Sequence, residues 1–136
     1  DGKFKSAGKV LICVPNARIA FAKVLPLFFP EPALPPGIHP TAIVAASAKL
    51  DASAHVGPYC VIGERVRVGA RSVLQGGNHV GADCGLDEDV NLFPNVTLYP
   101  GSEIGNRVRI HSGTVIGSDG FGYVLDGGVH RKVPQM

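Results

Sequence analysis

Five histidines are the residues best suited to proton transfer, because imidazole titrates near neutral pH. None is spaced from a Ser, Cys or Asp as a catalytic triad requires, and no two show the close spacing of metal ligands. We therefore expect polar surface residues, with no catalytic group and no metal site in this chain. The histidines are His39, His55, His79, His111 and His130, of which His55 and His79 are expected at turns.

The segment Asp119–Tyr123, with the sequence DGFGY, is the best candidate for a binding site. It interrupts a regular repeat, and loops that leave a repetitive core usually carry function. We predict that substrate is bound by Asp119, Gly120, Phe121, Gly122 and Tyr123. The alternative is that the two aromatic rings only cover the side of the molecule or a neighbouring subunit.

The repeat that must position this segment has a period of six residues. A six-residue period fits neither an α-helix nor a simple alternating strand, but it is typical of a triangular parallel β-solenoid. The aliphatic position recurs without a break at Ile38, Val44, Leu50, Val56, Ile62, Val68, Leu74, Val80, Leu86, Leu92, Leu98, Ile104, Ile110 and Ile116. We predict coils over residues 38–121, with one short strand and one corner in each hexad and three hexads in each coil.

Residues 18 positions apart should therefore stack in columns. Val56, Leu74 and Leu92 are expected directly above one another with their side chains inside. Arg71, Asp89 and Arg107 share an outer corner column, and we predict surface pairing between their opposite charges; an anion site is the minority alternative. The formal charge of +2 argues against a nucleic-acid partner.

The residues before the repeat resemble the end of a small α/β domain, assigned to residues 1–29. Residues 9–14 (KVLICV) predict a buried strand, and Asn16 can cap a helix beginning at Ala17 that Pro26 should kink or end early. Residues 30–37 contain four prolines and predict a stiff linker. No segment indicates a signal peptide or a membrane-spanning helix.

Two further features complete the prediction. Residues 122–136 should form an excursion hairpin, because Asp126-Gly127-Gly128 supplies turn residues between alternating segments, and this hairpin would lead to further coils. The three cysteines are too few for a disulfide framework and are expected to be reduced, as in a cytosolic protein.

Three stretches of the sequence carry a resemblance to a known family. They are GIHPTAIV after the proline-rich linker, SGTVIGSDGFGY over Ser112–Tyr123, and KVPQ over Lys132–Gln135. Together with the predicted strand and helix within Leu11–Leu25, they resemble UDP-3-O-acylglucosamine N-acyltransferase. The resemblance implies a left-handed parallel β-helix of hexapeptide repeats and a preceding uridine-binding domain.

The resemblance also implies an activity. Members of that family are cytoplasmic homotrimers of lipid A biosynthesis that transfer a 3-hydroxyacyl chain from acyl carrier protein to the 2-amine of a UDP-acylglucosamine. They need no cofactor beyond the phosphopantetheine of the carrier protein. The family's catalytic histidine lies in later coils, beyond Met136, so we expect this chain alone to be inactive.

Two other functions stay open from the sequence. One is a noncatalytic hexapeptide scaffold that only trimerises. The other is a different hexapeptide transferase, such as an enzyme that uses acetyl-coenzyme A. Acyl-chain length is not indicated by these residues.

Overall fold

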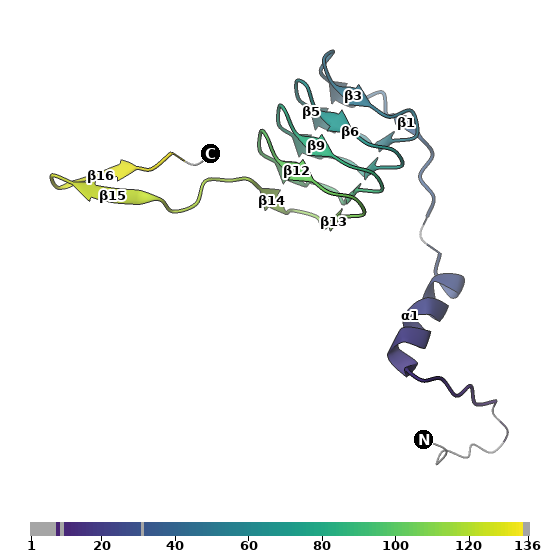
Figure 1. The fold of residues 1–136 in the computed structure, drawn as a ribbon. Coiled ribbons are helices and arrows are strands. Elements are labelled where there is room, and N and C mark those ends of the chain that lie inside the picture. Colours follow the sequence, from purple (N-terminus) through teal and green to yellow (C-terminus); the bar gives the residue numbers. More distant parts are fainter. Residues whose placement is uncertain (1–7, 9, 31, 135–136) are drawn as a thin grey trace. The chain divides into compact units, whose positions relative to one another are not determined.

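The computed structural model describes residues 8, 10–30 and 32–134, and the chain divides into two units, Asp1–Ala33 and Leu34–Met136. Figure 1 shows a single helix in the first unit and a stack of coils in the second.

Helix α1 (Ala17–Phe28) is the regular element of the first unit. The Asn16 side chain accepts hydrogen bonds from the backbone N–H groups of Arg18 and Ile19, at 3.0 and 3.1 Å, which confirms the predicted cap. The helix continues two residues beyond Pro26 and ends at Phe28. The ring nitrogen of Pro26 has no hydrogen to donate to the carbonyl of Ala22, so one bond is missing from the last turn.

The buried strand predicted for residues 9–14 is wrong for the part that can be described. Residues 10–14 are exposed and form no strand, and Lys9 lies outside the described residues. An apolar run becomes a strand only where a neighbouring strand pairs with its backbone, and the described part of this unit contains none.

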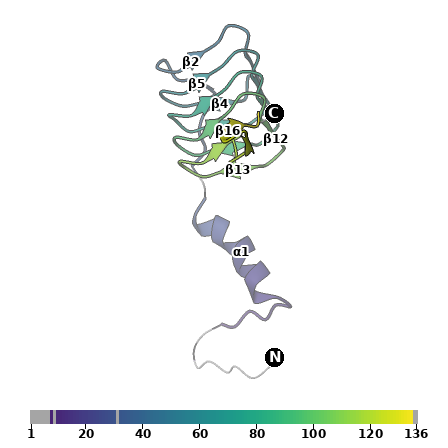
Figure 2. The same cartoon turned by 90° about the vertical axis from the view of Figure 1, so that its left-hand side faces the viewer.

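The second unit is a parallel β-solenoid with three sheets, each built from every third strand (Figures 1 and 2). The first sheet contains β1 (Gly37–Ile38), β4 (His55–Val56), β7 (Val73–Leu74), β10 (Asn91–Leu92) and β13 (Arg109–Ile110). The second contains β2 (Ile43–Val44), β5 (Val61–Ile62), β8 (His79–Val80), β11 (Thr97–Leu98) and β14 (Val115–Ile116). The third contains β3 (Lys49–Leu50), β6 (Arg67–Val68), β9 (Gly85–Leu86) and β12 (Glu103–Ile104).

Strand pairing confirms the predicted stacking. Val56 pairs with Leu74, and Leu74 pairs with Leu92, each 18 residues apart. All three side chains are buried, and the other inward positions of the middle coils join them in one core. Packing of these aliphatic columns is the main source of stability in a fold whose strands are only two residues long.

The corners after the first coil use a left-handed backbone conformation. Among the described residues, seven other than glycine have positive φ, and each lies three positions after an inward aliphatic: Tyr59, Arg65, Arg71, Asp83, Asp89, Asn95 and Arg107. From Gly77 to Arg107, the N–H of the corner residue donates to a carbonyl of the coil before it, as from Asp89 to Ala70 at 2.9 Å. This bond offsets the cost of positive φ in residues with a side chain.

Between the first and second coils, hydroxyl groups take the place of the backbone carbonyl as acceptors for the corner N–H groups. Thr41, Ser47 and Ser53 occupy the three corners of the first coil, and each accepts a hydrogen bond from the corner N–H of the next coil, at 3.1, 3.0 and 2.9 Å. Thr41 of the GIHPTAIV stretch thus has a structural role, because it accepts from the N–H of Tyr59 and also contacts the His39 ring nitrogen at 2.9 Å.

Polar donors lie inside the solenoid at three successive corners, which together make one complete ring around its axis. Ser72, Asn78 and Cys84 are buried at three successive corners, and each donates to a carbonyl 15 residues later, at 2.6, 2.7 and 3.1 Å. Burial of an amide such as that of Asn78 would be costly without these partners. The ring therefore fixes how two adjacent coils stack.

The predicted excursion hairpin is present. Strand β15 (Tyr123–Asp126) pairs antiparallel with β16 (Val129–Lys132). Gly127 and Gly128 have φ of 55° and 81°, the signs that a two-residue type I′ turn requires. Gln135 and Met136 of the predicted range lie outside the described residues.

Candidate functional site

The candidate segment Asp119–Tyr123 consists of an irregular loop that follows β14 and of Tyr123, the first residue of β15. The N–H of Gly122 donates to the carbonyl of Gly120 at 2.9 Å, which places Phe121 at the tip of a three-residue turn. The Phe121 side chain is 94% exposed. Its ring lies 5.3 Å from that of Tyr123, tilted by 48°. The loop thus presents a pair of aromatic rings at the surface.

Two contacts join this loop to the end of the hairpin. The Lys132 ammonium forms an ion pair with the Asp119 carboxylate, and the N–H of Val133 donates to the carbonyl of Gly122 at 2.7 Å. The DGFGY and KVPQ strings, which are separate in the sequence, are therefore in direct contact. The sequence did not indicate this contact, because it depends on the hairpin register that brings Lys132 opposite Tyr123.

The histidines do not form a common centre. His55 and His79 lie in strands β4 and β8 rather than at turns, because each directly precedes an inward aliphatic residue. His55 donates from Nδ1 to the carbonyl of Pro35 at 2.7 Å, and His111 stacks on Phe93 with ring centres 4.5 Å apart. Among the described residues, no group of three or more His, Cys, Asp or Glu side chains is placed to hold a metal ion.

The outer surface of the second sheet is apolar and hollowed. A groove of about 400 Å³ crosses β5, β8 and β11, with Val61, Gly63, His79, Gly81, Thr97 and Tyr99 among its lining residues. A side chain at Gly63 or Gly81 would meet the backbone of the next coil, so the glycines are needed for coil stacking and leave the groove open. No motif of the sequence indicates this groove.

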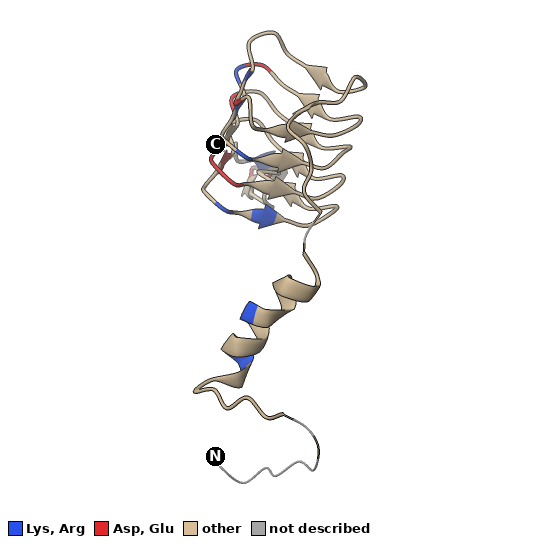
Figure 3. Cartoon of the chain, turned by 90° about the vertical axis from the view of Figure 1, so that its right-hand side faces the viewer, with Lys and Arg blue, Asp and Glu red and all other residues tan. Residues whose placement is uncertain are grey.

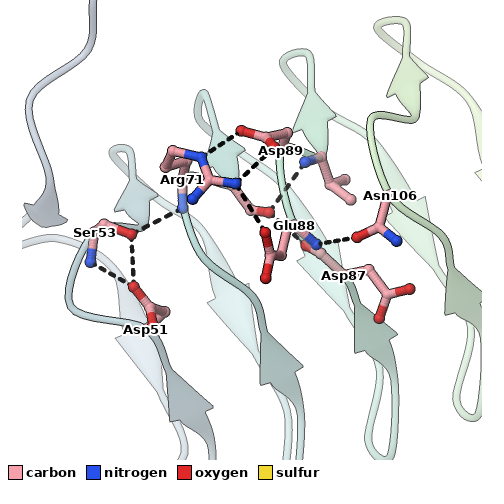
Figure 4. Close-up of polar contacts among 9 residues, drawn as sticks. Asp51, Ser53, Arg71, Asp87, Glu88, Asp89 and Asn106 are labelled. Atoms are coloured by element: carbon pink, nitrogen blue, oxygen red, sulfur yellow. Dashed lines mark hydrogen bonds and ion pairs between the residues drawn. The ribbon is translucent and has the colours of Figure 1, made fainter.

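Charges gather instead along another side of the prism (Figure 3). The Arg71 guanidinium contacts both carboxylate oxygens of Asp89 at 2.8 Å and Glu88 at 2.8 Å, as Figure 4 shows. Arg71 holds the pKa of Asp89 below its usual range, chiefly through its hydrogen bonds, and Arg107 adds a weaker attraction. The predicted pairing of Arg71 with Asp89 is confirmed.

One long-range ion pair depends on a glycine. Arg67 and Glu103 pair at 2.8 Å although they lie two coils apart, on either side of Gly85. A Cβ on Gly85 would collide with the Glu103 carboxylate, so the missing side chain opens the path between the two charges. In the sequence, such a pair is indicated by Arg, Gly and Glu at successive 18-residue intervals, here Arg67, Gly85 and Glu103.

The cysteines are free, as predicted. Cys60 and Cys84 are buried, and Cys13 is exposed. Burial raises the pKa of the Cys60 and Cys84 thiols, which keeps them protonated and unreactive at neutral pH.

A family match and a solved structure both place the coils among hexapeptide-repeat proteins. Residues 83–118 match the bacterial transferase hexapeptide (six repeats) family. The solved structure of a perosamine N-acetyltransferase variant from Caulobacter crescentus covers 72% of this chain with a TM-score of 0.51 and 23% identity, and the match covers 52% of that chain. The predicted left-handed parallel β-helix of hexapeptide repeats is thereby confirmed.

Sequence relatives then give a particular similarity. The chain is 41% identical over 136 residues to the UDP-3-O-acylglucosamine N-acyltransferase of Polynucleobacter asymbioticus, covering 96% of this chain and 38% of the relative. It is 50% identical over 122 residues to the enzyme of that name from Coxiella burnetii, covering 89% of this chain and 36% of the relative. The resemblance stated from the sequence motifs is confirmed. The chain spans little more than a third of the length of these relatives.

Within the described residues, no helix is both long enough and apolar enough to cross a membrane.

Proposed function

We propose that this chain is part of an acyltransferase that moves a 3-hydroxyacyl group from acyl carrier protein to the 2-amine of UDP-3-O-acylglucosamine, in lipid A biosynthesis in the cytoplasm. The observation that carries the proposal is 41 to 50% identity to enzymes of that name across nearly the whole chain. The transferase family match within the coils agrees with it.

The role proposed for these residues is binding rather than bond making. Asp119, Gly120, Phe121, Gly122 and Tyr123 bind the UDP-sugar, with the aromatic pair as the apolar part of the contact. The base that removes a proton from the attacking amine comes from a histidine outside residues 1–136, and backbone amides stabilise the tetrahedral oxyanion. The acyl donor carries its own phosphopantetheine, and the chain's residues need no cofactor for this role.

The proposed assembly is a homotrimer. Its support is the outer column of the second sheet, which contains no Asp, Glu, Lys or Arg and in which Ile43 and Val115 are exposed beside the apolar groove. Apolar surface of this kind is costly in water and is stabilised when a neighbouring subunit covers it.

An acyl-transfer assay tests the function. A polypeptide that contains this sequence and matches its relatives in length should acylate UDP-3-O-acylglucosamine with acyl carrier protein as donor, and residues 1–136 alone should not. Transfer from acetyl-coenzyme A but not from the carrier protein would instead indicate another hexapeptide transferase. Binding of neither substrate by the longer polypeptide would contradict the proposal and favour a noncatalytic scaffold.

A further inference from the structure

The aromatic tip of the Asp119–Tyr123 loop has few internal contacts to hold it. Phe121 is almost fully exposed, and all eight strand residues of the hairpin that follows are exposed. An isolated two-stranded hairpin is only marginally stable in water. The shape of the loop therefore depends on the few polar contacts at its base.

Lys132 makes the side-chain contact that closes this base. It is the last residue of β16, and its ammonium pairs with Asp119, four residues before the first residue of β15. The neighbouring backbone bond from Val133 to Gly122 closes the same end. Lys132 and Val133 thus hold the two ends of the tip, at Asp119 and Gly122, with Phe121 between them.

We propose that Lys132 is a positioning residue that fixes the Asp119–Tyr123 loop so that Phe121 and Tyr123 meet the UDP-sugar in one preformed arrangement. The inference rests on the proposed function of this loop. The side chains of Lys132 and Asp119 are each 49% accessible, so the pair adds little to global stability and acts mainly on loop geometry. A preformed loop binds more tightly because less ordering occurs on binding.

The chain offers a matched control. Arg131 forms an ion pair with Asp126 at 2.6 Å in the same hairpin, and both side chains of this pair are also exposed. Asp126 lies next to the turn of the hairpin, so the Arg131–Asp126 pair makes no contact with Asp119. Lys132→Met and Arg131→Met therefore each remove one exposed ion pair, but only Lys132→Met removes the contact to Asp119.

Two measurements test the proposal. Backbone ¹⁵N relaxation of the chain reports the order of Gly120–Tyr123, which should fall in Lys132→Met and persist in Arg131→Met and Lys132→Arg. In the active longer polypeptide, Lys132→Met should raise KM for the UDP-sugar about tenfold with a smaller change in kcat. The charge exchange Asp119→Lys with Lys132→Asp should restore the order of the loop.

Unchanged order of Gly120–Tyr123 in Lys132→Met would overturn the proposal. So would a loss of order that leaves KM unchanged, because the loop would then not position substrate. Failure of the unmodified longer polypeptide to transfer acyl groups is a separate result that contradicts the proposed function, and the relaxation data still report on the contact itself. The melting temperature of each variant confirms that the prism remains folded.

Discussion

At the scale of single residues, glycine is needed where adjacent coils approach most closely. The position after the inward aliphatic holds glycine in several hexads, but its surroundings differ. A Cβ at Gly57 would collide with the backbone carbonyl of Gln75, whereas no described atom lies within 4 Å of the same position at Gly105. The backbone of an adjacent coil cannot move aside as the end of a flexible side chain can.

Replacement of these two glycines should therefore have different effects. Gly57→Ala should destabilise the chain by about 2 to 3 kcal/mol, because the added methyl group forces coils apart. Gly105→Ala should change stability by less than about 0.5 kcal/mol. Chemical unfolding followed by circular dichroism measures both. Equal losses for the two variants would contradict the packing explanation.

The Arg71 contacts lead to a pH-dependent prediction. Arg71 lowers the pKa of Asp89 in the folded state, so the pair contributes stability that is present above the pKa of an unfolded aspartate, about 4, and is lost as pH falls through the lower folded value. Arg71→Met should lower the melting temperature at pH 7, and its difference from the unsubstituted chain should shrink below pH 4. Melting curves from pH 2 to 8 check this.

Lys49→Met is a suitable control for this experiment. Lys49 is exposed on the third sheet, and the structure shows no ion pair for it within the described residues. The difference in melting temperature between Lys49→Met and the unsubstituted chain should stay nearly constant over this acidic range. A difference for Arg71→Met that persists at pH 2 would assign its effect to packing rather than charge.

At the scale of elements, the hairpin depends on positive φ angles at the two residues of its turn. Gly127 and Gly128 both have positive φ, and Asp126 pairs with Val129 across the turn. Asparagine tolerates this conformation far better than a β-branched residue does, because its side chain is short and can form local hydrogen bonds.

Gly127→Asn should therefore keep the hairpin, and Gly128→Val should disrupt it at a cost of about 1 to 2 kcal/mol. Cross-strand nuclear Overhauser effects between Leu125 and His130, which are paired in the structure, report on the outcome. Because the hairpin supplies Lys132, Gly128→Val should also reduce the order of the Asp119–Tyr123 loop. An intact hairpin in Gly128→Val would contradict the turn assignment.

At the scale of the whole solenoid unit, the sequence predicts the core better than the contacts around it. Inward columns follow from spacing alone, so Val56, Leu74 and Leu92 could be placed without coordinates. The partners of the Asn78 amide include the N–H of Gly76 and the carbonyl of Phe93, and no side-chain pattern indicates these backbone partners. The Lys132–Asp119 contact likewise depends on a loop conformation that has no repeat to define it.

Loss of whole hexads tests the repeat itself. Removal of residues 63–80 takes out one coil and leaves every later strand in its original sheet, whereas removal of 63–68 moves each later strand to a different sheet. Spin labels at Ser47 and Gly101, which share a corner column, should come closer by about 5 Å after the longer deletion. They should move apart after the shorter deletion, because the labels then lie at different corners.

A decrease in the distance between the labels after the six-residue deletion would contradict this prediction. It would show that the later strands had returned to their original sheets despite the missing hexad. Circular dichroism of both deletions confirms that β-structure persists.

The constant separation of 18 residues between paired strands also bears on synthesis in the cell. Each newly made coil finds its pairing partner in the chain that immediately precedes it, so no strand of the solenoid waits for a distant segment to leave the ribosome. The solenoid can therefore fold coil by coil during translation. At any moment, only the most recently formed coil has strands with unpaired backbone groups at an open edge.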